Sequence, residues 1–250
     1  MSAPTASRLD PSTIVSTNPG RNYEVVGEVR VSTAADITVA VRQARAALPA
    51  WQRLTVAGRV KALEPVASLF EQHRQEIAEI IAREMGAPAA HADGSTSWAL
   101  NRMRWTLDNA AACLAPEITF EDAEEIHKVF YEPLGVAAVI TPWNFPQSNF
   151  VMGALQPLLA GNTVVYKLSE EVPMFGQLLD RLMAAAQLPA GVFNQVYGDG
   201  WVGEALARSD IDAIFFTGSS AVGRKLYRIA AEKFIPVHLE LGGSDAGIVL

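Results

Sequence analysis

Short apolar runs alternate with amphipathic stretches along the chain after Gly135. Each run has the β-prone composition of a buried strand. The stretches between the runs, near 147–159, 173–187, 201–208 and 220–233, are predicted to be helical. A repeated strand–helix–strand order predicts a parallel sheet with helices on its faces, which is an α/β fold. The predicted strands are 136–140, 163–167, 192–196, 213–217 and 237–241.

The first half of the chain is predicted to be mostly helical. Thr33 and Asp36 have capping-box spacing at the start of the first helical pattern. A second helix is predicted to begin at Thr55, and Pro65 within its pattern predicts a kink or a break. A further helix is expected over about 95–114, where Pro116 follows soon after.

Two other segments have strand-like composition but stand apart from the predicted sheet. Residues 117–131 contain two β-rich runs around the acidic turn "EDAEE", which predicts a projecting hairpin. Residues 246–250 form an apolar run typical of a buried strand. Both segments are expected to expose edges and apolar surface unless further chain covers them.

Composition excludes several classes of protein. Half of the 250 residues are apolar and 19% are charged, which excludes disorder, and no apolar run approaches the ~20 residues of a membrane span. The net charge of −7 comes without a basic stripe, so neither nucleic acid nor membrane is an expected partner. The four histidines and the single cysteine, Cys113, have no metal-ligand spacing. One cysteine and an N-terminus without a signal-peptide core predict a cytoplasmic location.

The residues that follow the predicted strands carry the candidate chemistry, because parallel sheets bind ligands beyond the carboxyl ends of their strands. After the first strand comes "TPWNFP", residues 141–146, in which Asn144 could donate a fixed N–H to a developing oxyanion or simply cap the next helix. After the second strand, Lys167 and Glu170 suit the hydroxyls of a ribose, or they form a surface ion pair.

The last two strands are followed by weaker signals. Ser219 lies in "GSSAVG" where a helix would begin, and a helix N-terminus can bind a pyrophosphate, although a Gly–Ser turn is also common. Glu240 in "VHLEL", partly shielded by leucines, could act as a general base, while a solvated strand-edge acid is the simpler interpretation.

Together these motifs resemble the aldehyde dehydrogenase family from about residue 16 to residue 250. The resemblance is carried by "EPLGVAAVITPWNFP", "GNTVVYKLSE", "FTGSSAVG" and "LELGG", in that order. It implies a Rossmann-like parallel sheet, Asn144 as the oxyanion-hole amide and Glu240 as the general base. It also implies a cofactor site formed by Thr141, Pro142, Trp143, Lys167, Ser169, Glu170, Gly200, Phe216, Thr217, Gly218, Ser219, Val222, Leu241 and Gly242.

The resemblance also implies a mechanism and a cofactor. In this family a cysteine thiolate adds to a small-molecule aldehyde, a hydride passes to the nicotinamide, and water hydrolyses the thioester. We expect NAD rather than NADP, because the carboxylate of Glu170 would accept from a free 2′-hydroxyl and repel a 2′-phosphate. The segment "GGSDAG" is similar to members that act on semialdehydes such as succinate semialdehyde.

The nucleophile of the family lies a few dozen residues beyond the "LELGG" glutamate, outside this sequence, and Cys113 is interpreted as a small buried hydrophobic residue. Two hypotheses follow. The chain is the N-terminal portion of an NAD(P)-dependent aldehyde dehydrogenase, or it is a non-catalytic NAD-binding remnant. Members of the family are homo-oligomers, whereas association of this chain by itself is doubtful.

The resemblance divides the chain into expected parts. The divisions are a disordered tail over 1–15, a helical part of the cofactor-binding domain over 16–115, an oligomerisation-type hairpin over 116–132, a dinucleotide-binding domain over 133–243 and the start of a truncated catalytic domain over 244–250.

Overall fold

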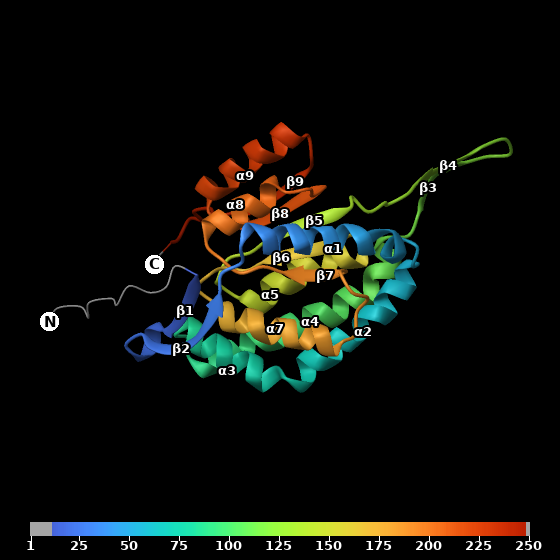
Figure 1. Cartoon of the computed structure of the whole chain (residues 1–250). Helices are drawn as coiled ribbons and strands as arrows, with labels where there is room; N and C mark the ends of the chain where they lie inside the picture. The colour runs from blue at the N-terminus through green and yellow to red at the C-terminus, as the bar shows by residue number, and fades with distance from the viewer. Residues whose placement is uncertain (1–11, 249–250) are drawn as a thin grey trace.

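The computed structural model describes residues 12–248 and contains a parallel five-stranded sheet between two layers of helices (Figure 1). The strand order is β7-β6-β5-β8-β9. The predicted α/β fold class is therefore confirmed, and all five predicted strands keep their limits to within one residue. The strands are β5 (Val136–Ile140), β6 (Thr163–Lys167), β7 (Phe193–Gln195), β8 (Ala213–Gly218) and β9 (Val237–Leu241).

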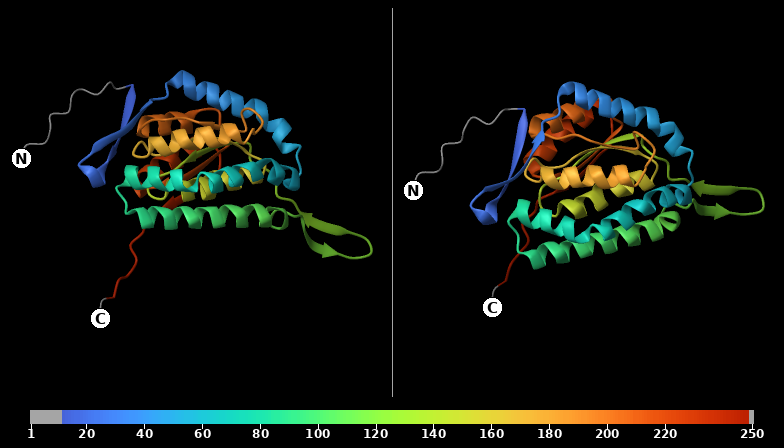
Figure 2. Two further views of the ribbon diagram at one scale, coloured as in Figure 1. Left: turned by 90° about the horizontal axis from the view of Figure 1, so that it is seen from below. Right: turned by 60° about the horizontal axis from the view of Figure 1, so that its bottom comes forward.

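The central strands are buried on both faces, because helices cover each side of the sheet (Figure 2). Side chains of β5 alternate between two clusters, with Ala137 and Val139 in one and Val136 and Ile140 in the other. One face is covered by α1 (Ala34–Gln52), α8 (Gly200–Arg208) and α9 (Ser220–Lys233). The other is covered by α2 (Val56–Gln72), α3 (Arg74–Met85), α4 (Ala89–Cys113), α5 (Pro146–Phe150), η2 (Val151–Leu155), α6 (Gln156–Leu159) and α7 (Pro173–Ala185).

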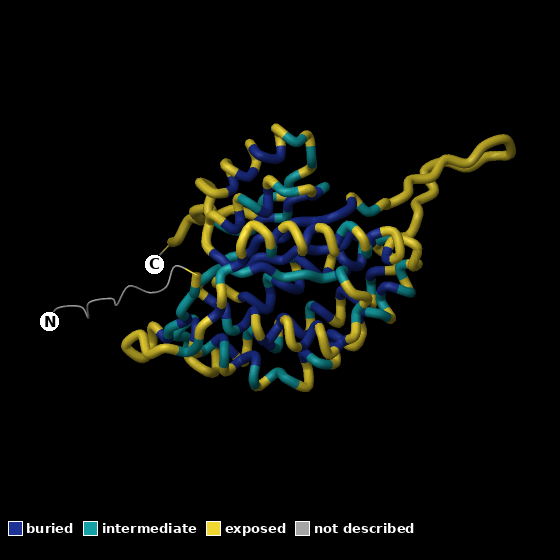
Figure 3. Tube along the Cα trace, viewed as in Figure 1, coloured by how far each residue is buried: buried dark blue, intermediate teal, exposed yellow. Residues whose placement is uncertain are grey.

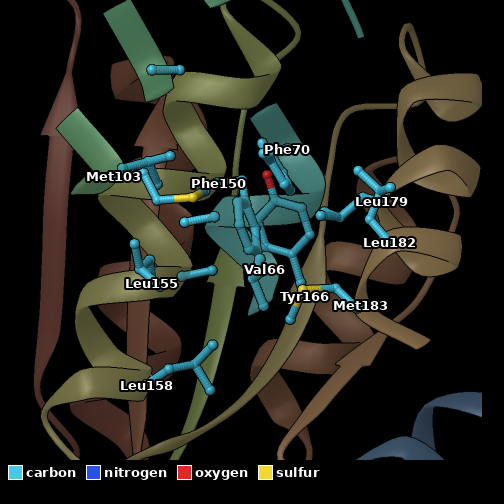
Figure 4. Close-up of a cluster of buried hydrophobic side chains, with 14 of the residues drawn as sticks. Val66, Phe70, Met103, Phe150, Leu155, Leu158, Tyr166, Leu179, Leu182 and Met183 are labelled. Carbon is cyan, nitrogen blue, oxygen red and sulfur yellow. The ribbon is translucent and has the colours of Figure 1, made fainter. Parts of the chain in front are cut away.

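Aromatic rings pack among aliphatic side chains in the larger of the two clusters (Figure 4). Phe150 of α5 stacks on Phe70 of α2, with ring centroids 5.4 Å apart, and meets Tyr166 of β6 edge-on at 6.1 Å. All three rings are at most 1% exposed. Such pairs contribute about 0.5–1.5 kcal/mol each beyond the burial of their area. This packing fixes α5, and with it the loop that leads into α5, against β6.

Helix starts agree with the expected caps at two places. Thr33 and Asp36 form the predicted capping box of α1, and the Thr55 hydroxyl accepts from the backbone N–H of Gly58 at the start of α2. Of the kink or break predicted at Pro65, the break does not occur, since α2 continues through this residue. Pro65 lies on the exposed side of the helix, so water can satisfy the carbonyl that loses its partner.

The structure differs from the expectations near the N-terminus. Residues 12–15 belong to the tail expected to be disordered, but β1 (Thr13–Asn18) begins there and pairs with β2 (Glu24–Arg30) around the short helix η1 (Pro19–Arg21). Residues 1–11 of that expected tail lie outside the described residues. The helix expected over 95–114 begins earlier, as α4 at Ala89 directly after Pro88.

The hairpin of β3 (Glu117–Glu121) and β4 (Ile126–Val129) is confirmed and projects from the body (Figure 1). Every residue of both strands is exposed (Figure 3). Within residues 12–248, no helix is both long and apolar enough to cross a lipid bilayer.

The strand expected over 246–250 does not form in its described part. Residues 242–248 have no regular secondary structure and are exposed, and 249–250 lie outside the described residues. A strand needs a neighbour for its backbone hydrogen bonds, and none pairs with residues 242–248. Cys113, expected to be buried, is exposed because it lies in the last turn of α4, at the base of the projecting hairpin.

Candidate functional site

The predicted site residues follow neighbouring strands at the carboxyl edge of the sheet. The backbone N–H of Thr141 donates to the carbonyl of Lys167, at 3.0 Å, so the ends of β5 and β6 are adjacent. On the other side of β5, Ile140 pairs with Phe216, and β8 places Thr217 opposite Glu240. The chain moves from β5 to one side of the sheet and later returns to the other, which makes β5 and β8 flank the topological switch point.

Asn144 lies in the loop between β5 and α5, where Pro142 and Trp143 precede it. The N-cap position of α5 is Phe145, and no side chain of the described residues caps this helix. The capping interpretation of Asn144 is therefore wrong. Among the described residues the Asn144 side chain has no hydrogen-bond partner, and it is exposed. Its amide is free to donate to a ligand.

Lys167 and Glu170 form an ion pair with an Nζ–Oε2 distance of 3.0 Å. The Lys167 side chain is only 5% exposed, whereas that of Glu170 is 40% exposed, so this is not the surface pair considered from sequence. Lys167 ends β6 and its ammonium meets Glu170 just past the sheet edge. Between them the Ser169 hydroxyl accepts from the backbone N–H of Glu171.

Two helices begin at the same edge of the sheet. Ser219 caps α9, and its hydroxyl accepts from the backbone N–H of Val222 at 3.3 Å. Gly218 precedes it, and a Cβ there would lie 2.5 Å from the Phe216 ring. Gly200 is the first residue of α8. Each helix start directs unpaired N–H groups and a positive dipole end towards the sheet edge, where they favour an anion.

Glu240 is exposed on β9 and is not shielded by its leucine neighbours as the sequence suggested. Successive strand residues point to opposite faces, so Leu239 enters the core below α9 while Glu240 faces away from it. His238 lies on the same face, and its Nε2 is 3.1 Å from Oε1 of Glu240. Beyond the strand, Leu241 packs on Gly223 of α9, and Gly242 is exposed.

A cleft of about 780 Å³ runs along the face of the sheet that β8 and β9 leave without a covering helix. It extends from the base of the hairpin to the carboxyl edge and brings together Thr141, Phe216, Thr217 and Glu240. Asn144, Lys167, Glu170 and Ser219 are not among its lining residues, so the structure does not place all predicted site residues in one cavity. The lining residues that the sequence analysis missed include His238, Asn149, Met152 and Gln156.

Thr141 is held by a buried tyrosine. The hydroxyl groups of Thr141 and Tyr166 are 2.8 Å apart, and Tyr166 is fully buried. Burial raises the pKa of the Tyr166 phenol well above its ordinary value. The phenol therefore stays neutral and fixes the position of Thr141 where the switch point opens. Asn149 gave no distinct signal in the sequence, since it ends the polar run Gln147–Asn149 before the apolar stretch "FVMGAL".

The sheet order and the polar groups at its switch point define a Rossmann-like α/β domain of the dinucleotide-binding type. A family model described as the aldehyde dehydrogenase family matches residues 6–250. The chain belongs to this family, whose members depend on NAD or NADP. The resemblance seen in the sequence is thereby confirmed.

Known relatives extend well beyond the matched region. The chain is 35% identical over 235 residues to the NADP(+) succinate-semialdehyde dehydrogenase of Escherichia coli K12, covering 93% of this chain and 48% of that protein. It is 36% identical to the α-ketoglutaric semialdehyde dehydrogenase of Bacillus subtilis strain 168, with 93% and 48% covered. A crystal structure of an NAD-dependent aldehyde dehydrogenase from Sinorhizobium meliloti superposes with a TM-score of 0.86 and 36% identity, with 93% and 47% covered. The chain spans about half the length of the curated relatives it matches.

Proposed function

We propose that this chain is the cofactor-binding part of an NAD-dependent aldehyde dehydrogenase and contributes two groups to the chemistry of aldehyde oxidation. The observation that carries the proposal is the alignment of Thr141, Lys167, Thr217 and Ser219 along one sheet edge at the switch point. Rossmann-like sheets bind dinucleotides at this place.

The residues present suit the two polar parts of a dinucleotide. The capped start of α9 and the glycine before it leave room for a pyrophosphate beside backbone N–H groups. The pair of Lys167 and Glu170 offers a cation and a carboxylate to the vicinal hydroxyls of a ribose. A carboxylate accepts from a free 2′-hydroxyl but repels a 2′-phosphate, which supports NAD over NADP. The remaining predicted contacts are Pro142, Trp143, Ser169, Gly200, Phe216, Gly218, Val222, Leu241 and Gly242.

The chemical roles proposed for this chain belong to Asn144 and Glu240. The Asn144 amide, which has no hydrogen-bond partner in the described part of the chain, would donate to an oxyanion that develops on the substrate carbonyl oxygen. Glu240, exposed in the wall of the cleft, would accept a proton from the water that attacks the acyl group. NAD, when bound, supplies the hydride acceptor for the reaction.

We infer that the cysteine nucleophile is not among these 250 residues. Cys113 is the single cysteine, and it is absent from the lining of the cleft that holds Glu240. The purified 250-residue chain should therefore produce no NADH when it is supplied with an aldehyde and NAD+. A non-catalytic NAD-binding protein would give the same result. Sustained NADH production that Cys113→Ala abolishes would refute this assignment of the nucleophile.

Three finer assignments complete the proposal. The substrate is a small aldehyde, and a semialdehyde is favoured because the curated relatives named above are semialdehyde dehydrogenases by name. The exposed hairpin, with Ile118 and Phe120 on β3, supports a contact with another chain, which size-exclusion chromatography would detect as association. The single cysteine supports a reducing compartment such as the cytoplasm.

The test is calorimetric titration of the purified chain with NAD+ and with NADP+. Glu170→Ala should weaken NAD+ binding about tenfold, since a charge-assisted hydrogen bond contributes about 1.5 kcal/mol or more. The same substitution should narrow the preference for NAD+ over NADP+ by removing a repulsive charge. Glu171→Ala is the matched control, because it removes an adjacent exposed acid and changes the net charge equally. Equal loss in both variants, or no NAD+ binding by the wild-type chain, would overturn the proposal.

A further inference from the structure

Asn149 joins two backbone positions of the loop that carries Asn144. Its side-chain Nδ2 donates to the carbonyl of Asn144 at 2.7 Å and, more weakly, to the carbonyl of Pro142 at 3.3 Å. Its backbone N–H donates to the carbonyl of Phe145 at 2.9 Å. One residue of α5 thus holds three of the four carbonyls between Pro142 and Phe145.

The loop needs such a restraint, because its last residue has an unfavourable backbone conformation. Phe145 has φ 56° and ψ 53°, in the left-handed region that bulky residues rarely adopt. A residue held there costs on the order of 1–3 kcal/mol and persists only when its surroundings fix it. Within residues 12–248 no side chain caps α5, and Pro146 at its first position has no N–H to contribute. The Asn149 amide supplies a restraint that the helix start itself lacks.

Restraint of the loop determines where the Asn144 amide can point. The Asn144 side chain is exposed and has no hydrogen-bond partner among the described residues, so its own contacts do not orient it. Its backbone carbonyl, however, is held by the shorter of the two Asn149 bonds. Fixing the backbone limits the side chain to a few rotamers. A donor for a developing oxyanion is effective when it is already in place before the charge appears.

We propose that Asn149 is a positioning residue for Asn144, and that its amide holds the loop so that the Asn144 side chain is presented at the carboxyl edge of the sheet. The importance of this role for catalysis rests on the proposed function. Asn149 also lines the cleft together with Thr141 and Glu240, so the restraint lies in the wall of the candidate site.

Trp143 is a local reporter, because it lies between the two carbonyls that the Asn149 side chain holds. The chain has five tryptophans, so 5-fluorotryptophan labelling gives five ¹⁹F resonances. The resonance that disappears in Trp143→Phe is assigned to Trp143. Asn149→Ala removes both side-chain bonds. Asn149→Asp keeps the shape but, when ionised, cannot donate and repels the carbonyls. Both variants should shift or broaden the Trp143 resonance and leave the other four in place.

Asn109→Ala is the matched control. Asn109 also donates its side-chain amide to a backbone carbonyl, that of Trp105 at 2.8 Å, but on the exposed surface of α4. This variant should leave the Trp143 resonance unchanged. A general loss of stability would affect all three variants alike, whereas the proposed role affects only the Asn149 variants.

Titration with NAD+ completes the experiment. If the ordered loop is part of the cofactor site, the Asn149 variants should bind NAD+ about three- to tenfold more weakly, since only a fraction of molecules would hold the competent loop. An unchanged Trp143 resonance in Asn149→Asp would overturn the positioning role, whatever the affinity. If the Trp143 resonance shifts in the Asn149 variants but the wild-type chain binds no NAD+, the positioning role of Asn149 is supported. The proposed function is then refuted instead.

Discussion

Glu84 of α3 is a buried carboxyl group whose substitution should change how stability depends on pH. It is 4% exposed, at the junction of β1, α3 and α7. It accepts from the Ser16 hydroxyl at 2.7 Å and from the backbone N–H groups of Met174 and Phe175, both at 2.8 Å. Burial raises the pKa of Glu84 from 4.5 to about 7, although these hydrogen bonds oppose the shift.

The sign of the pH effect follows from proton linkage. Between pH 4.5 and 7 the folded protein holds a proton on Glu84 that the unfolded chain has lost. Stability from this group is therefore greatest below pH 4.5, falls as the pH rises, and levels off above pH 7. A shift of about 2.5 pKa units corresponds to about 3 kcal/mol at 1.36 kcal/mol per unit. Roughly 2 kcal/mol of this change lies between pH 5.5 and pH 8.

Glu84→Gln removes the titration and keeps the size of the side chain. Thermal unfolding followed by circular dichroism at pH 5.5 and pH 8 measures the difference between wild type and variant. From pH 5.5 to pH 8, the unfolding midpoint temperature of the wild type should fall by about 4–8 °C relative to that of the variant, at about 2–4 °C per kcal/mol. Glu79→Gln, on the exposed side of the same helix, should show no such change. If the midpoint of the wild type instead rises relative to that of the variant as the pH rises, the hydrogen bonds lower the pKa of Glu84 more than burial raises it. The reasoning is then refuted.

Three further substitutions, each followed by urea titration, test the packing of the sheet and of the helices around it. Gly135 has φ 134°, and an added Cβ would lie 2.0 Å from a carboxylate oxygen of Asp212, so Gly135→Ala should cost more than about 3 kcal/mol in unfolding free energy. Gly94→Ala, where a Cβ meets nothing within 4 Å, should stabilise α4 by about 0.5–1 kcal/mol in the same urea titration. Arg59, 7% exposed, donates to two backbone carbonyls, and Arg59→Met should cost about 2 kcal/mol; a Met variant with an unchanged urea midpoint would contradict its structural role.

The sequence alone was sufficient to predict the limits of elements with a clear local signal, such as strands whose residues are all buried. The strands β5 and β6 are buried along their whole length, so their apolar composition marked their limits. The limits of α9 were also predicted correctly, and Ser219 marked its start. The ribbon of β1 and β2 was missed, because most of its residues are partly or fully exposed and give no apolar signal.

Predictions from local sequence were wrong where the tertiary surroundings of a segment determine its structure. Pro65 favours a helix break by its own geometry, but it lies on the solvent side of α2, where the helix tolerates it. The apolar run after Gly243 has the composition of a strand, yet its described part pairs with nothing. Composition records which side chains favour burial, and it does not record whether a partner strand is present.

The sequence by itself determined the family, the α/β class and the identities of the candidate site residues, because these depend on residue type and order. Only the tertiary structure decided how those residues meet. It buried Lys167 beside Glu170, left the Asn144 amide without a partner among residues 12–248, and exposed Glu240 in the wall of a cleft. The physical reason is that strand order, and not chain order, sets the neighbours: β5 pairs with β8, and β8 with β9, across long stretches of intervening chain.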